Sequence, residues 1–149
     1  MSTATSVADN DIPAGFHPLE QGGPYFQALG PVYAKRQPDG TALMGLRIEA
    51  KHTNMLGVTH GGMLATLADS ALGMNVSMLR QPRQHLVTVS LSVDYLSAAQ
   101  PGDWLEAHVT VRRQGRQLAF AECLLRVGER VMLRASGVFS VTGRPRHIG

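Results

Sequence analysis

The sequence contains one cysteine, Cys123, among its 149 residues. A single cysteine forms no intrachain disulfide and cannot supply a cysteine-based zinc site. Charged residues are also scarce, at 17% of the chain, and there is no Lys/Arg run of the kind that binds nucleic acid. No uncharged apolar run reaches the length that crosses a membrane. We therefore expect neither nucleic acid nor a membrane among the partners of this protein.

The remaining composition is that of one globular domain. Hydrophobic residues make up 44% of the chain, and the net charge is +3. A surface with so little charge suggests that another subunit covers part of it. Residues 1–23 lack the apolar core of a signal peptide, which predicts a cytoplasmic protein. We expect a flexible segment at 1–23, a single domain at 24–142 and a basic tail at 143–149.

The stretch from His60 to Leu79 is the centre of the expected fold. Apolar residues fall on every side of this predicted helix, which we expect to end near Pro82. A helix of that kind must be enclosed on most sides. Its only formally charged residue is Asp69, and a carboxylate in such surroundings needs compensating partners. Function is the leading explanation for Asp69, and a structural bond to a neighbouring loop is the alternative.

The rest of the chain predicts strands. Two strands, 32–36 and 41–49, precede the helix and are joined by the turn at 37–40. After the helix, residues 87–95 alternate with period two, with Val87, Val89 and Leu91 on one face. Three further strands follow, up to residue 141. This order predicts an α+β protein in which a curved antiparallel sheet of about six strands wraps around one long central helix.

The start of the helix carries Gly61 and Gly62. Unpaired N–H groups at a helix N-terminus form an anion site, and a glycine lets a ligand oxygen approach the backbone. Such donors can also form an oxyanion hole for acyl transfer. The alternative is that two glycines only permit close packing of the helix on the sheet.

Gly61 and Asp69 are eight residues apart, which is about 12 Å along one helix. Two groups that act on one carbonyl must each come within about 3 Å of it. They can converge only if Asp69 of a second chain faces Gly61 of the first. A two-fold axis would create two such sites in a dimer.

The motif Asn54-x-x-Gly57-x-x-His60-Gly61-Gly62, with Asp69 on the helix that follows, resembles the signature of hotdog-fold thioesterases. Within that family it is most similar to the PaaI-like acyl-CoA thioesterases of phenylacetate degradation. The resemblance extends over residues 24–142 and includes the segment Gly115-Arg116-Gln117-Leu118-Ala119-Phe120. It implies a hotdog fold, a dimer with a continuous sheet that usually pairs into a homotetramer, and hydrolysis of an acyl-CoA thioester to the free acid and CoA.

The resemblance also implies roles for five residues. The Gly61 N–H would bind the thioester oxygen, while Asn54 and His60 would hold the loop and polarise the carbonyl. Asp69 of the neighbouring chain would be the general base or the nucleophile. Thr88 lies where some relatives have a hydroxyl residue that positions the water.

Substrate contacts are expected at Gly62, at Thr66 and at Met74, which would line an acyl tunnel. The CoA phosphates would meet Arg113 and Arg116, although an ordinary solvated turn is the favoured interpretation for any single arginine. Aromatic and medium aliphatic acyl groups both fit the small and flexible residues of the helix. The reaction needs no metal and no redox cofactor, so we expect no cofactor besides the CoA of the substrate.

Several alternatives remain. The protein could be a hotdog module that binds acyl-CoA or acyl groups without turnover; a hydratase of this fold would need a His and an acid in other motifs. A metal site at His60 and Asp69 lacks a compact ligand cluster. We expect Cys123 to be a small core residue rather than a nucleophile. Three other histidines could in principle act in catalysis or metal binding, and we interpret them as surface or strand residues: His52, His85 and His108.

Overall fold

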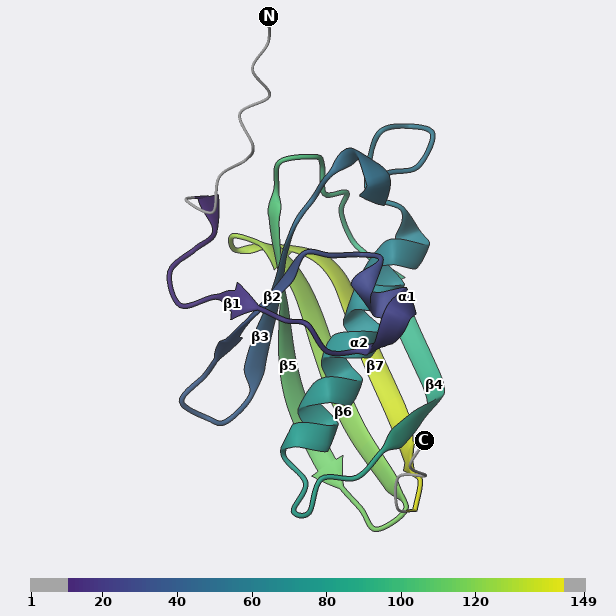
Figure 1. Cartoon of the computed structure of the whole chain (residues 1–149). Helices are drawn as coiled ribbons and strands as arrows, with labels where there is room; N and C mark the ends of the chain where they lie inside the picture. Colours follow the sequence, from purple (N-terminus) through teal and green to yellow (C-terminus); the bar gives the residue numbers. More distant parts are fainter. Residues whose placement is uncertain (1–10, 144–149) are drawn as a thin grey trace, which may run out of the picture.

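The computed structural model describes residues 11–143 and shows one antiparallel sheet packed against one long helix (Figure 1). Within that range the helices are α1 (Gly23–Gln27) and α2 (Gly61–Met78), and a 3-10 helix at Ala50–His52 precedes α2. The strands are β1 (His17–Pro18), β2 (Val32–Arg36), β3 (Ala42–Arg47), β4 (Leu86–Tyr95), β5 (Trp104–Gln114), β6 (Leu118–Val127) and β7 (Arg130–Val141). The expected α+β order is confirmed.

The sheet has the strand order β1-β2-β3-β5-β6-β7-β4. It exceeds the expected count of about six because the two residues of β1 pair with β2, in the segment that the sequence predicts to be flexible. The expectations for residues 1–10 and for the tail at 144–149 lie outside the described residues. Strand β4 forms one edge of the sheet, so one side of its backbone has no neighbouring strand among residues 11–143.

Helix α2 lies across the strands and buries one of its faces on them (Figure 1). Its core-facing residues are almost completely buried: Leu64, Leu67, Ala68, Ala71, Leu72 and Val76. The opposite stripe follows the same helical spacing and stays partly exposed: Gly62, Thr66, Asp69, Ser70, Gly73, Met74 and Ser77. Within a single chain the sheet therefore covers α2 on one side only. The helix residues expected in the site other than Gly61 all lie on the partly exposed stripe.

Asn75 fixes α2 to the sheet from within the core. Its side chain is fully buried and accepts a hydrogen bond from the Ala42 N–H at 2.8 Å. The same amide donates to the carbonyls of Ala42 at 3.1 Å and Ala71 at 2.9 Å. Because a buried amide needs these partners, the bonds fix the helix beside the start of β3.

Strand β4 changes face at a β-bulge. Its pairing with β7 is regular on both sides of Val89, which is the extra residue between Thr88↔Phe139 and Ser90↔Val138. A bulge shifts the alternation of the strand by one residue. Thr88 therefore faces α2, while Val87 and Val89 are 52% and 59% exposed. The alternation expected from the sequence, with Val87, Val89 and Leu91 on one face, is therefore wrong at these two valines.

Candidate active site

The N-terminus of α2 is capped by His60. Its Nδ1 accepts a hydrogen bond from the Gly62 N–H at 2.9 Å. A ring nitrogen that accepts carries no proton, so this bond assigns the His60 proton to Nε2. The Gly61 N–H has no acceptor among residues 11–143. The first turn of α2 therefore offers the Gly61 N–H as a donor, while the Gly62 N–H is already engaged.

The loop before α2 is built around Asn54. Its Oδ1 accepts from the Leu56 N–H at 2.9 Å, and its carbonyl accepts from the Gly57 N–H at 3.0 Å. Gly57 has a φ of 77°, in the left-handed region that favours glycine. The Asn54 side chain thus holds the turn of this loop.

The expectation that His52 is a surface or strand histidine is wrong, because His52 lies neither on the surface nor on a strand. It is 2% exposed and lies in the 3-10 helix. Its Nδ1 accepts from the Glu49 N–H at 2.9 Å, which assigns the proton to Nε2, 2.7 Å from the Leu29 carbonyl. Its own carbonyl accepts from the His60 N–H at 2.8 Å. His52 therefore holds the loop that leads to the cap of α2.

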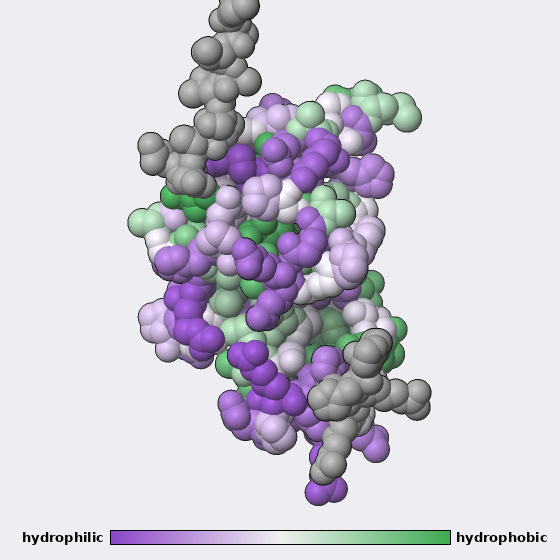
Figure 2. Space-filling model, viewed as in Figure 1, coloured by the Kyte–Doolittle hydropathy of each residue, from purple (hydrophilic) through white to green (hydrophobic). Residues whose placement is uncertain are grey.

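Asp69 lies on the partly exposed stripe of α2 beside β4. The Thr88 hydroxyl donates to Asp69 Oδ1 at 2.8 Å, which leaves Oδ2 free of hydrogen bonds from residues 11–143. Both residues border a groove of about 810 Å³ between α2, the N-terminal segment and β4. The space-filling view of this side shows apolar surface in the middle of the face, bordered by polar groups (Figure 2). The carboxylate thus adjoins a groove whose wall includes Phe26, Met74 and Phe139.

The single chain brings together only part of the expected site. It places Asp69 beside Thr88, and it places Met74 in the same groove. Gly61 and Asp69 are on one helix, eight residues apart, which corresponds to about 12 Å. The Thr66 hydroxyl donates to the Gly62 carbonyl at 2.8 Å and is therefore engaged within the helix.

Tyr95 also belongs to this region, although the sequence alone indicates no role for it. Its hydroxyl donates to the Gly61 carbonyl at 2.8 Å from the end of β4. The partners are 34 residues apart in sequence. No local pattern links them, so only the fold identifies this contact.

The arginines at the β5–β6 turn differ in their charge partners. Arg112 pairs with Glu122 at 2.9 Å. Arg113 and Arg116 are exposed and have no carboxylate within 4.0 Å in the described part of the chain. Both are therefore available to an anion, at the end of the sheet near the C-terminus of α2, where Gln114 donates to the Val76 carbonyl at 2.9 Å.

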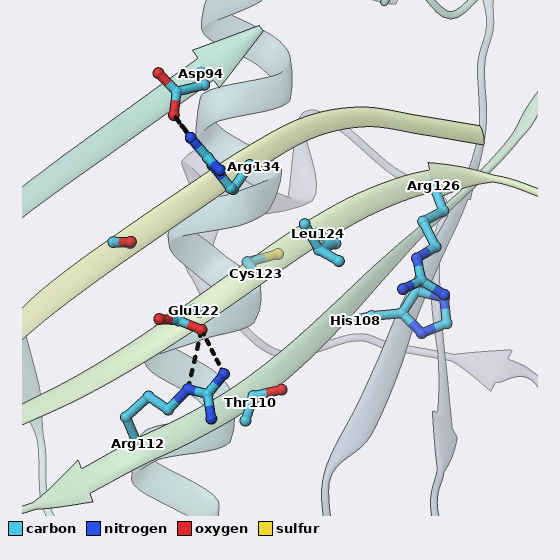
Figure 3. Close-up of a pocket in the computed structure, with 10 residues that line it drawn as sticks. Asp94, His108, Thr110, Arg112, Glu122, Cys123, Leu124, Arg126 and Arg134 are labelled. Carbon is cyan, nitrogen blue, oxygen red and sulfur yellow. Dashed lines mark hydrogen bonds and ion pairs between the residues drawn. The ribbon is translucent and has the colours of Figure 1, made fainter. Parts of the chain in front are cut away.

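A second hollow, of about 530 Å³, lies on the other face of the sheet (Figure 3). Its carboxylates are paired, since Asp94 contacts Arg134 at 2.8 Å and Glu122 contacts Arg112. Burial lowers the pKa of His108, and Arg126 adds to this effect while Glu106 opposes it. The hollow contains none of the residues expected in the site, and its paired charges are typical of a solvated sheet face.

Cys123 lies in the core, as expected. Burial raises its pKa to about 12, so the thiolate needed for nucleophilic attack does not form near neutral pH. Among the described residues, no group of three or more His, Cys, Asp or Glu side chains has the arrangement of a metal site. Neither helix in residues 11–143 is long and apolar enough to cross a membrane.

The chain is similar to known proteins over most of its length. The profile of the thioesterase superfamily matches residues 56–134. The protein PA0474 of Pseudomonas aeruginosa is 43% identical over 87% of this chain and 96% of its own length. Human acyl-coenzyme A thioesterase 13 is 28% identical, over 83% of this chain and 84% of its own.

Solved structures show the same architecture. The BH2602 protein of Bacillus halodurans, whose structure was determined with CoA, superposes with a TM-score of 0.73 and is 28% identical. The match covers 83% of this chain and 82% of the other. The helix, the sheet and the family profile agree with the resemblance seen in the sequence. The chain therefore belongs to the thioesterase superfamily and has the hotdog fold.

Proposed function

We propose that this protein is an acyl-CoA thioesterase that hydrolyses an acyl-CoA to the free carboxylic acid and CoA. The observation that carries the proposal is the Thr88–Asp69 pair at the edge of a groove that is lined by both apolar and polar side chains. A fixed carboxylate beside a groove with apolar side chains suits attack on an acyl group that those side chains bind. The similarity to human acyl-coenzyme A thioesterase 13 and to a protein that binds CoA supports this substrate class.

We propose that each site is shared by two subunits. The reason is the separation of about 12 Å between Gly61 and Asp69 along one helix. The edge strand β4, with its exposed valines, is the surface on which a second copy would extend the sheet. A two-fold axis beside β4 would set the two α2 helices antiparallel, so that Asp69 of the partner subunit faces Gly61. Two such dimers would form the homotetramer.

In this site the Gly61 N–H would donate to the thioester oxygen and stabilise the negative charge that develops there. Asp69 of the partner subunit would take a proton from water through its free oxygen, Oδ2, while Thr88 holds Oδ1. The hydroxide oxygen would bond to the carbonyl carbon, the carbon–sulfur bond would then break, and the proton held by Asp69 would pass to the sulfur of the departing CoA thiolate. Alternatively, the carboxylate itself would attack, and water would hydrolyse the resulting anhydride.

The length of the groove limits the length of the acyl group that it can bind. From Asp69 to Met78 the helix wall runs for about 13 Å, and Met74 lies between them. This length suits aromatic or medium aliphatic acyl groups. Arg113 and Arg116 would bind the CoA phosphates. The reaction as proposed consumes only acyl-CoA and water.

The test combines turnover with subunit mixing. Purified protein is assayed against phenylacetyl-CoA and aliphatic acyl-CoAs of increasing length, with a thiol reagent to detect CoA. Asp69→Ala and Gly61→Ala are each expected to be inactive. Heterodimers of the two variants would contain one intact site, so mixing them by refolding would restore about a quarter of wild-type activity.

Each result has a distinct meaning. If the mixture stays as inactive as its components, the shared site is wrong. A strictly monomeric wild-type protein would also contradict it. If the wild-type protein binds CoA but hydrolyses no acyl-CoA, the protein is the non-catalytic binding module instead.

A further inference from the structure

Tyr95 contacts Gly61 in two ways. Its hydroxyl donates to the Gly61 carbonyl at 2.8 Å. Its ring also lies against the Gly61 Cα, because a Cβ added there would be 3.3 Å from each of Cε1, Cζ and the hydroxyl oxygen of Tyr95. The ring therefore occupies the space that a side chain at position 61 would need.

This contact disfavours a side chain at position 61. Gly61 does not have a positive φ, so its backbone conformation is open to any L-residue. A side chain at position 61 is disfavoured instead by the Tyr95 ring, because its Cβ would lie closer to the ring than side-chain atoms ordinarily lie. The glycine of the motif and the tyrosine at the end of β4 therefore form one packing unit.

We propose that Tyr95 is a positioning residue for the Gly61 N–H, an inference that rests on the proposed thioesterase function. A donor to a developing oxyanion is effective when it is held in place before the reaction. Tyr95 holds residue 61 through its carbonyl and through its Cα, and these two contacts limit the movement of the adjoining N–H. Tyr95 itself does not touch the reacting atoms.

The same strand also fixes the carboxylate. β4 carries Thr88, which bonds Asp69, and Tyr95, which bonds Gly61. In the shared-site dimer, Asp69 and Gly61 of one chain would belong to different active sites. Each β4 would thus position the base of one site and the oxyanion donor of the other.

The experiment compares Tyr95→Phe, Tyr95→Leu, Gly61→Ala and the double variant Gly61→Ala/Tyr95→Leu. Tyr95→Phe keeps the ring but loses the hydrogen bond, so kcat is expected to fall roughly 10-fold with KM unchanged. Removing the ring makes room for a methyl group, so the double variant is expected to have a higher kcat and a higher Tm than Gly61→Ala alone. Tyr33→Phe is the matched control, because Tyr33 packs on Trp104 instead.

A third readout does not depend on activity. In the ¹H–¹⁵N spectrum, Tyr95→Phe is expected to shift the Gly61 amide signal, whereas Tyr33→Phe leaves it in place. The proposal is overturned if Tyr95→Phe keeps the wild-type kcat, or if the double variant is no better than Gly61→Ala. A fall in Tm without a change in kcat would reduce Tyr95 to a structural role. Absence of turnover in the wild type would instead overturn the thioesterase proposal, while the amide signal and the Tm comparison would still test the Tyr95–Gly61 unit.

Discussion

The Thr88 hydroxyl reaches Asp69 at 2.8 Å because the bulge at Val89 turns Thr88 toward α2. If the same residues alternated regularly, without a bulge, Thr88 would share the outer face of the sheet with Ser90 and Ser92. Bulges near functional sites commonly re-aim a side chain in this way. The bond therefore depends on the pairing of β4 with β7 rather than on the local sequence alone.

Thr88→Val tests this bond, because valine keeps the shape of threonine and loses the donor. A hydrogen bond to a charged group contributes about 1.5–3 kcal/mol, so kcat is expected to fall roughly 10- to 100-fold. The kcat of the variant is measured by steady-state hydrolysis of an acyl-CoA. Thr110→Val, on the outer face of β5, is the control and should keep wild-type activity. Equal activity of both variants would show that Thr88 has no part in the reaction.

Asp69→Asn removes the charge of the proposed base and keeps its size. General-base catalysis contributes about 100-fold or more, so turnover is expected to fall at least that far while Tm changes little. Asp94→Asn is the matched control, since Asp94 lies on the same strand as Thr88 but pairs with Arg134 on the outer face. Retained turnover in Asp69→Asn would contradict the assigned role.

Met74→Trp is expected to shorten the acyl groups that the enzyme accepts. Met74 lines the groove next to Asp69, and a larger ring there fills space that a long chain would use. The ratio of kcat/KM for a short to a long acyl-CoA should rise about 10-fold or more. Leu118→Trp, on the exposed face of β6, should leave this ratio unchanged. An unchanged ratio in Met74→Trp would place the acyl group elsewhere.

The double variant Arg113→Gln/Arg116→Gln tests the phosphate contacts. Its KM for an acyl-CoA is expected to rise roughly 10-fold at low salt and less at high salt, because exposed charge contacts are screened. The thioester of N-acetylcysteamine, which lacks the nucleotide, should show no change. Arg112→Gln is the control, because Arg112 is already paired with Glu122. A rise in KM for both substrates would argue against phosphate binding.

The raised pKa of the buried Cys123 thiol leads us to expect that the stability of the protein depends on pH. Its folded-state pKa of about 12 lies above the ordinary value of 9.0, so the unfolded chain loses the proton first as the pH rises. The free energy of unfolding should therefore fall between pH 9 and pH 12, by about 1 kcal/mol at pH 10. Denaturant unfolding at pH 7 and pH 10 measures this, and Cys123→Ala should show a smaller fall. The folded thiol should also resist the thiol reagent used in the activity assay.

Much of the fold could be predicted because its signals are local. The helical periodicity of α2 and the period-two alternation in residues 105–111 each lie within one element, and the structure reproduces both. The sheet of one chain, however, covers α2 on one side rather than on most sides. The face of α2 that carries Asp69 also follows from helical spacing. The sequence places the glycines and the acid on one helix, and that spacing alone suggests a shared site.

The missed features depend on contacts between distant segments. The bulge at Val89 arises from register with β7, some 50 residues further along the chain. His52 is buried because it bonds Leu29, a partner that its own neighbourhood does not reveal. The role of Tyr95 becomes visible only when β4 lies beside the start of α2.

The buried amide of Asn75 has a consequence for the geometry of the whole site. Sliding α2 by one residue along its axis would move it about 1.5 Å and would break both bonds to Ala42. Because Gly61 and Asp69 are both on that helix, Asn75 fixes the position of both along the helix axis relative to the sheet. One side chain outside the groove lining thus determines where the N-terminus and the middle of the helix can meet a substrate.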